Sequence, residues 1–181
     1  MKMGKHRFMH CVFTFMIGFW AFLFSSTGFG QVIASTGLNA VVPGSAYRNL
    51  IGQDFVEFGI GFYGDNQFFV HDKIAIKYEG SYTFLIGQGS LRADHTHLGV
   101  GSNFFFRPEG YIVRPYAGMT VGLDFLMGRF FFANALISGV YFEFSEQIGI
   151  DVSARYRMGF GETNLFFFEP RIGLVVNFDY F

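Results

Sequence analysis

Two histidines in the segment Asp94-His95-Thr96-His97 are the side chains of this sequence best suited to metal binding or acid–base chemistry. Because side chains alternate across a β-strand, His95 and His97 would point the same way. Two imidazoles could hold a metal ion, but no third ligand can be assigned. All five histidines lie at or before position 97, and no recognisable motif pairs a nucleophile with a base, as hydrolysis requires. We predict no catalytic residue, metal site or cofactor, and interpret the histidines as part of a polar interior.

Apolar residues recur at every second position in a long series of segments, and the charged residues fall on the positions between them. In residues 165–181, Ile172 and Tyr180 fall on the apolar face, whereas Glu169 and Asp179 fall on the other. Strict alternation of this length is the period of a β-strand. We predict that fourteen charged residues share one interior face and form an ion-pair network there. They are Glu57, Lys73, Lys77, Glu79, Arg107, Arg114, Asp124, Glu143, Asp151, Arg155, Arg157, Glu169, Arg171 and Asp179.

The alternation divides the chain into eight strands, with turn signals such as Gly64-Asp65-Asn66 and Pro108-Glu109-Gly110 between them. Each strand is long enough, or nearly so, to cross a bilayer, which takes about 9–11 residues. The sequence therefore predicts an all-β fold, an eight-stranded antiparallel transmembrane β-barrel with meander topology, in a domain spanning residues 31–181. The predicted strands are 31–42, 55–63, 73–87, 94–107, 111–127, 131–144, 148–158 and 165–181.

The two faces of these strands could be arranged in two ways. A soluble barrel of the lipocalin kind would place the apolar face inside, where the dense Phe and Tyr side chains would have to fit a narrow interior. A membrane barrel places it outside, because Arg or Lys facing lipid costs roughly 2–4 kcal/mol. The composition is 51% hydrophobic, 21% aromatic and 15% charged, which favours the membrane arrangement. The predicted interior holds seven acidic and seven basic residues, which would pair and plug the lumen.

The first thirty residues have the pattern of a signal peptide. Lys2, Lys5 and Arg7 precede an apolar stretch at 8–24, and small residues precede a cleavage site after Gly30. An uncleaved helical anchor is the alternative. Removal of these residues leaves ten Lys and Arg against fourteen Asp and Glu. This balance gives no indication of nucleic-acid binding.

Arg114-Pro115-Tyr116-Ala117-Gly118 follows a short turn and resembles a strand of the small outer-membrane barrels of the OmpA and OmpW type. The resemblance implies a barrel in the outer membrane of a Gram-negative cell, surrounded by outer-membrane lipid. The C-terminus is similar to the signal read by the barrel-assembly machinery, although Tyr180 rather than the final residue is in phase with the lipid face. The residues of this predicted signal are Arg171, Gly173, Val176, Phe178, Tyr180 and Phe181.

Three phenylalanine triplets, 104–106, 130–132 and 166–168, are interpreted as an interfacial girdle with some packing. The predicted outer loops are short. These features favour a structural or accessory barrel, or a subunit of a complex with other outer-membrane proteins. The alternative is a narrow OmpW-like channel for small hydrophobic solutes, supported by a weak first strand and the break at Pro43. A more remote alternative is a lipid-modifying barrel enzyme, although the late histidine of similar lipid A deacylases is missing here.

Overall fold

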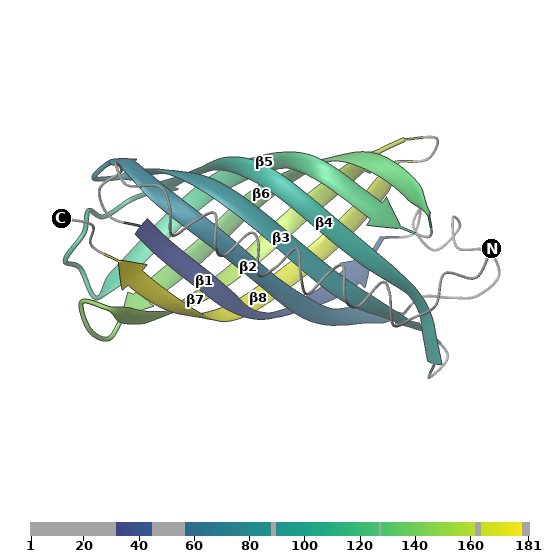
Figure 1. Ribbon diagram of the computed structural model, residues 1–181, viewed down its shortest axis with the longest axis horizontal. Helices are drawn as coiled ribbons and strands as arrows, with labels where there is room; N and C mark the ends of the chain where they lie inside the picture. The colour runs from purple at the N-terminus through teal and green to yellow at the C-terminus, as the bar shows by residue number, and fades with distance from the viewer. Residues whose placement is uncertain (1–31, 45–56, 88–89, 127, 162–163, 179–181) are drawn as a thin grey trace.

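The computed structural model describes residues 32–44, 57–87, 90–126, 128–161 and 164–178. These residues form one closed barrel of eight antiparallel strands in sequence order (Figure 1). The all-β meander predicted from the sequence is therefore confirmed. The predicted signal peptide, 1–30, and the last three residues lie outside the described residues. The strands are β1 (Val32–Pro43), β2 (Phe58–His71), β3 (Ile74–Gly87), β4 (Ser90–Phe105), β5 (Val113–Leu126), β6 (Arg129–Glu143), β7 (Ile148–Phe160) and β8 (Leu165–Phe178).

The two ends of the barrel differ in their connections. The terminal end, at the left of Figure 1, is where β1 begins and β8 ends. The connections 72–73, 106–112 and 144–147 also lie there, because the strands run antiparallel in sequence order. The strands β1, β3, β5 and β7 end at the opposite end, where β2, β4, β6 and β8 begin. Within the described ranges, no helix is long and apolar enough to cross a membrane.

The second strand is longer than the sequence predicted. Gly64-Asp65-Asn66 was expected to turn the chain, but β2 continues through it to His71. Asp65 pairs with Ser35 of β1 and with Glu79 of β3, so both neighbouring strands hold this segment extended. Pairing on both sides outweighs the local preference of Gly, Asp and Asn for turns. The turn instead falls after His71, and Asp65 enters the barrel interior.

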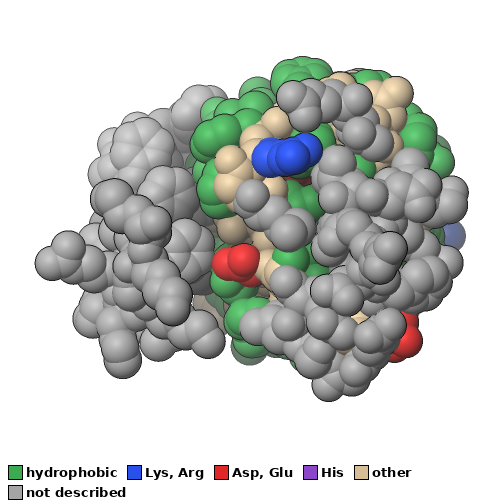
Figure 2. All heavy atoms as spheres, turned by 90° about the vertical axis from the view of Figure 1, so that its right-hand side faces the viewer, with side chains coloured by type: hydrophobic (Ala, Val, Ile, Leu, Met, Phe, Trp, Pro, Cys, Tyr) green, Lys and Arg blue, Asp and Glu red, His purple; other side chains and the backbone are tan. Residues whose placement is uncertain are grey.

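The outer wall of the barrel is apolar, and the charged side chains of the strands are mostly inside. Large apolar side chains such as Phe62 (56% exposed) and Ile172 (54% exposed) face outward, while Lys77 and Arg155 are at most 1% exposed. The end-on view in Figure 2 shows apolar side chains along much of the visible rim, with few charged ones between them. A wall of this kind needs lipid rather than water around it. The lipocalin-like alternative is therefore excluded.

The interior consists of a polar middle layer between two apolar clusters. The cluster at the opposite end contains Val41, Leu85, Ala93, Leu126, Phe131, Leu165 and Phe167. The cluster at the terminal end contains Ile33, Ala75, Phe105, Tyr116, Ile137, Tyr141 and Val175, with Phe69 packed against it. We call these the opposite cap and the terminal cap. Each cap fills the narrow lumen of an eight-stranded barrel with side chains.

The caps show how the phenylalanine triplets are divided between the outer wall and the packed interior. The central residues Phe105, Phe131 and Phe167 point inward and are buried, whereas exposed flanking residues such as Phe104 and Phe130 face outward. Because successive residues of a strand face opposite sides, one triplet supplies both the outer wall and a cap. Only the flanking phenylalanines can belong to an interfacial girdle.

Candidate functional site

The fourteen charged residues predicted for the interior are found in three kinds of place. Glu57 and Arg107 are exposed and Lys73 is half-buried, because all three lie in connections beyond the strand ends. Their prediction as interior residues is wrong, since the alternation continues past the last residue that enters the lumen. Glu143 is half-buried at the end of β6, and Asp179 lies outside the described residues. The buried ones are Lys77, Glu79, Arg114, Asp124, Asp151, Arg155, Arg157, Glu169 and Arg171.

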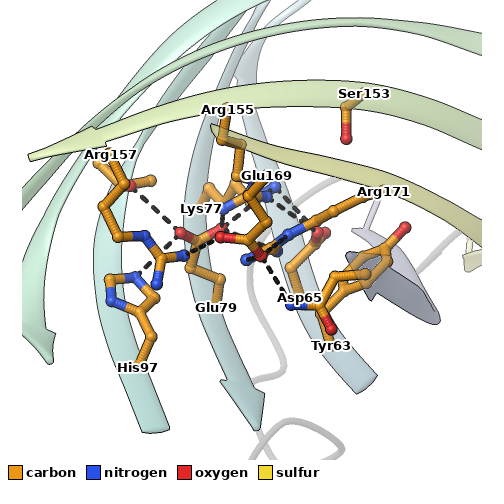
Figure 3. A network of polar contacts seen from close by, with 12 residues as sticks. Tyr63, Asp65, Lys77, Glu79, His97, Ser153, Arg155, Arg157, Glu169 and Arg171 are labelled. Carbon is orange, nitrogen blue, oxygen red and sulfur yellow. Dashed lines mark hydrogen bonds and ion pairs between the residues drawn. The ribbon is translucent and has the colours of Figure 1, made fainter. Parts of the chain in front are cut away.

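Glu79 of β3 is the carboxylate with the most partners in the middle layer (Figure 3). Arg155 Nη1, from β7, donates to its Oε2. Lys77 Nζ lies 3.5 Å from the same oxygen, and Thr120 Oγ1 donates to Oε1 over 3.1 Å. His97 Nε2 lies 3.2 Å from Oε1. Cations and donors from β3, β4, β5 and β7 therefore compensate one carboxylate that has no access to water.

Glu169 of β8 forms a second centre, which Arg171 links to the first, since Arg171 Nη1 lies 3.7 Å from Glu79 Oε2. Arg157 Nη2 lies 2.7 Å from its Oε2, and Arg171 Nε and Nη2 both lie 2.6 Å from its Oε1. Asn39 Nδ2 of β1 donates to the same Oε1 over 3.0 Å. Both nitrogens of Arg171 share this one oxygen, and hydrogen bonds between charged groups are roughly twice as strong as those between neutral groups. These bonds join β1, β7 and β8, the strands on both sides of the closing seam.

Asp124 of β5 contacts both His95 and His97, the two histidines considered in the sequence as metal-binding or acid–base residues. His97 Nδ1 lies 2.7 Å and His95 Nε2 lies 3.1 Å from Asp124 Oδ1. Arg157 Nη1 lies 3.3 Å from the same oxygen. The ring of His95 also stacks on Phe167 of the opposite cap, with centroids 5.3 Å apart. Among the described residues, no group of three or more His, Cys, Asp or Glu side chains is placed to hold a metal ion.

Asp65 belongs to the middle layer although the sequence analysis placed it in a turn. Its Oδ2 lies 2.9 Å from Lys77 Nζ and 3.9 Å from Arg155 Nη2. Gln67 Nε2 donates to its other oxygen over 3.3 Å. The residues on either side of Asp65 are Gly64 and Asn66, which fall on the outward face of the strand. Neither is a large apolar residue, so the sequence does not alternate between apolar and polar residues at this point. The signal that would have revealed the strand is therefore missing from the sequence.

Arg114 was predicted to join the network but stands apart from it. It is fully buried in the terminal cap, where its guanidinium carbon lies 4.7 Å from the ring centre of Phe105, 5.1 Å from Phe69 and 5.9 Å from Tyr141. A guanidinium within about 6 Å of an aromatic face is attracted by the ring. Arg114 therefore contributes to closing the terminal end rather than to the central ion pairs.

Inward tyrosines lie over glycines of other strands. A Cβ added at Gly139 would come 2.6 Å from the Cζ and Oη atoms of Tyr116, and one added at Gly173 would clash with Tyr63 Oη. Tyr116 Oη donates to Asp151 over 2.7 Å, and Ser153 donates to the same carboxylate over 3.1 Å. Because these glycines have no side chain, they leave room for tyrosine rings that reach the polar middle layer.

The described side chains fill the interior in layers. Ion pairs join strands across the middle layer, and apolar side chains cover that layer at both ends. A buried ion pair is costly to break, because separating it leaves an uncompensated charge out of water. Such an interior favours a rigid barrel.

Comparison with known proteins gives matches only at the level of structure. No protein-family model matches the sequence, and no curated protein matches it. Neisserial surface protein A (NspA) superposes with a TM-score of 0.60 at 14% identity, covering 82% of this chain and 96% of that one. The outer membrane protein OprG from Pseudomonas aeruginosa gives 0.59 at 13% identity, covering 83% and 96%. Ail, the attachment invasion locus protein of Yersinia pestis, gives 0.55 at 17% identity, covering 83% and 100%.

Identities this low establish likeness of fold. The predicted resemblance to small outer-membrane barrels is confirmed at that level, because the chain is an eight-stranded barrel that superposes on such proteins over most of their length. This chain has the fold of the small eight-stranded β-barrels of Gram-negative outer membranes.

Proposed function

We propose that the protein is an integral outer-membrane barrel with a closed lumen, which serves as a structural or accessory component rather than as a pore. The observation that carries this proposal is the three-layer interior, in which apolar caps enclose a network of ion pairs. A wide aqueous channel needs about 16 or more strands, and eight strands leave an interior that side chains just fill.

The orientation in the membrane follows from the topology. With an even number of strands, both ends of the chain lie on one side, and short turns are typical of the periplasmic side. The terminal end would therefore face the periplasm. The predicted assembly signal is consistent with this placement, since Arg171 and Gly173 face inward while Val176 and Phe178 face the lipid side. We propose the barrel-assembly machinery as the partner that reads it.

A closed barrel can still act through its lipid-facing wall, and other outer-membrane proteins are the partners that we propose. Extraction of the native membrane with a mild detergent, followed by mass measurement of the particle that contains this chain, tests the idea. A large and reproducible complex would support a subunit role. A particle with the mass of one barrel and its micelle would contradict that role and leave a solitary barrel.

A narrow route for hydrophobic solutes is the second candidate, and one feature of the seam favours it. The pairing of β1 with β8 omits Ala40 and Val41, which lie opposite Pro170 and Glu169. Proline has no backbone N–H to donate, so the ladder is weakened there. Val41 also belongs to the opposite cap, so an apolar compartment lies beside the weakened seam. Uptake of a hydrophobic solute that is lost on deletion of the gene would support this route, and unchanged uptake would exclude it.

We propose no catalytic role, because the buried histidines are bonded to carboxylates beneath the opposite cap. A chemically modified lipid A after overexpression would contradict this.

A further inference from the structure

His97 makes an unusual pair of contacts in the middle layer. The ring is buried, its Nδ1 lies 2.7 Å from Asp124 Oδ1, and its Nε2 lies 3.2 Å from Glu79 Oε1. An ionised carboxylate can only accept hydrogen bonds, and a neutral imidazole has only one N–H to donate. If both carboxylates are ionised, both ring nitrogens must carry hydrogen.

The surroundings keep both carboxylates ionised. Glu79 accepts from Arg155 and has Lys77 Nζ at 3.5 Å. Asp124 has Arg157 Nη1 at 3.3 Å. A carboxylate with an arginine against it favours its charged form. Arg171 Nη1 also lies 3.7 Å from Glu79 Oε2. His95, on the same strand as His97, contacts Asp124 through one nitrogen.

When every carboxylate of the middle layer is counted as ionised, the charge balance of that layer leads to the same conclusion. Its carboxylates outnumber its lysine and arginine side chains by one among the described residues. Arg114 does not fill the gap, because it lies in the terminal cap and interacts there with Glu109 and Glu143. The carboxylates are Asp65, Glu79, Asp124, Asp151 and Glu169, and the cations are Lys77, Arg155, Arg157 and Arg171.

We propose that His97 is a doubly protonated imidazolium in the folded barrel and acts as the fifth cation of the middle layer. It bridges β3 and β5 through Glu79 and Asp124. The interior is then a pH-sensitive device, because loss of the second proton removes one of the two bridging bonds and leaves one excess negative charge in the lumen.

Nitrogen-15 NMR of the histidine-labelled barrel, extracted in detergent at about pH 7.5, tests the protonation state directly, since an ordinary histidine is mostly neutral there. His71→Gln and His95→Gln variants identify the signals of the other two described histidines. The expected result is a ring at His97 with two protonated nitrogens. A ring with one bare nitrogen would overturn the proposal.

Unfolding in urea provides a second readout, followed at about pH 6 and about pH 9, where carboxylates and lysines keep their charge. The urea midpoint of the wild type should be lower at about pH 9 than at about pH 6. The midpoint of the His97→Gln variant should fall by less than half as much between these two pH values, and the midpoint of His95→Gln should fall as far as that of the wild type. Equal losses in His97→Gln and wild type would contradict the proposal. If His97→Gln does not fold, the NMR measurement on the wild type decides.

Discussion

The substitution Glu79→Gln tests the ion-pair network at its most connected point. The glutamine nearly matches the shape of Glu79 but removes the charge that compensates Arg155 and Lys77. Because Glu79 is buried, no water replaces the lost charge. Removal of one partner from a buried ion pair costs about 3–5 kcal/mol. With a urea dependence of roughly 1–3 kcal/mol per molar, the unfolding midpoint should fall by about 1–5 M.

The assay is urea unfolding of the detergent-solubilised barrel, followed by its β-sheet circular dichroism. The only tryptophan, Trp20, lies in the predicted signal peptide, so tryptophan fluorescence would not report on the barrel. Glu57→Gln is the matched control, because Glu57 is exposed and lies outside the strands. It should change the stability by less than about 0.5 kcal/mol. A Glu79→Gln variant as stable as this control would refute the network as a source of stability.

A double substitution separates the pair from its surroundings. Arg155→Met should cost less in the Glu79→Gln background than in the wild type, because the arginine no longer has its principal partner. Coupling energies between residues in one ion-pair network are about 0.5–3 kcal/mol. Equal costs in the two backgrounds would show that the two side chains do not act together.

Three further predictions concern the lumen and the wall. Gly139→Ala should destabilise the barrel by about 1–3 kcal/mol in urea unfolding, because the methyl group would displace Tyr116, whereas Gly80→Ala meets only ordinary contacts and should be nearly neutral. Ile172→Arg should cost about 2–4 kcal/mol in refolding into lipid vesicles, and Ile172→Val should cost under about 1.5 kcal/mol, since the side chain faces outward at mid-strand. Phe131→Ala should lower the unfolding free energy by about 3–5 kcal/mol, since it removes a ring from the opposite cap, but should create no conductance while the ion pairs remain.

Much of the fold could be predicted because its period was visible in the residues. Along β3 and β8 every outward position is apolar or small, so alternation alone located these strands and assigned their faces. The error in β2 shows the limit of this reasoning. Gly64 and Asn66 face outward without being apolar, and only pairing with β1 and β3 reveals that the chain stays extended.

Which residues reach the interior, and at what height along the barrel, was harder to predict than which face of a strand they lie on. Alternation assigns a face but not a height along the barrel, so Glu57 and Arg107 were grouped with residues that do reach the lumen. The same limit hid the caps. Ile137 and Val175 are apolar residues at positions of their strands where polar residues alternate, and both belong to the terminal cap. Heights follow from the register between strands, which single-strand patterns do not contain.

Electrical recording from the purified barrel in a planar lipid bilayer tests the central claim most directly, because a pore carries an ionic current in this assay and a closed barrel carries none. The account predicts that barrels shown to be folded by circular dichroism produce no conductance steps, since apolar caps enclose the ion pairs at both ends. Conductance steps that recur with the wild-type barrel in independent preparations would contradict this account and would mean that the interior opens in the membrane.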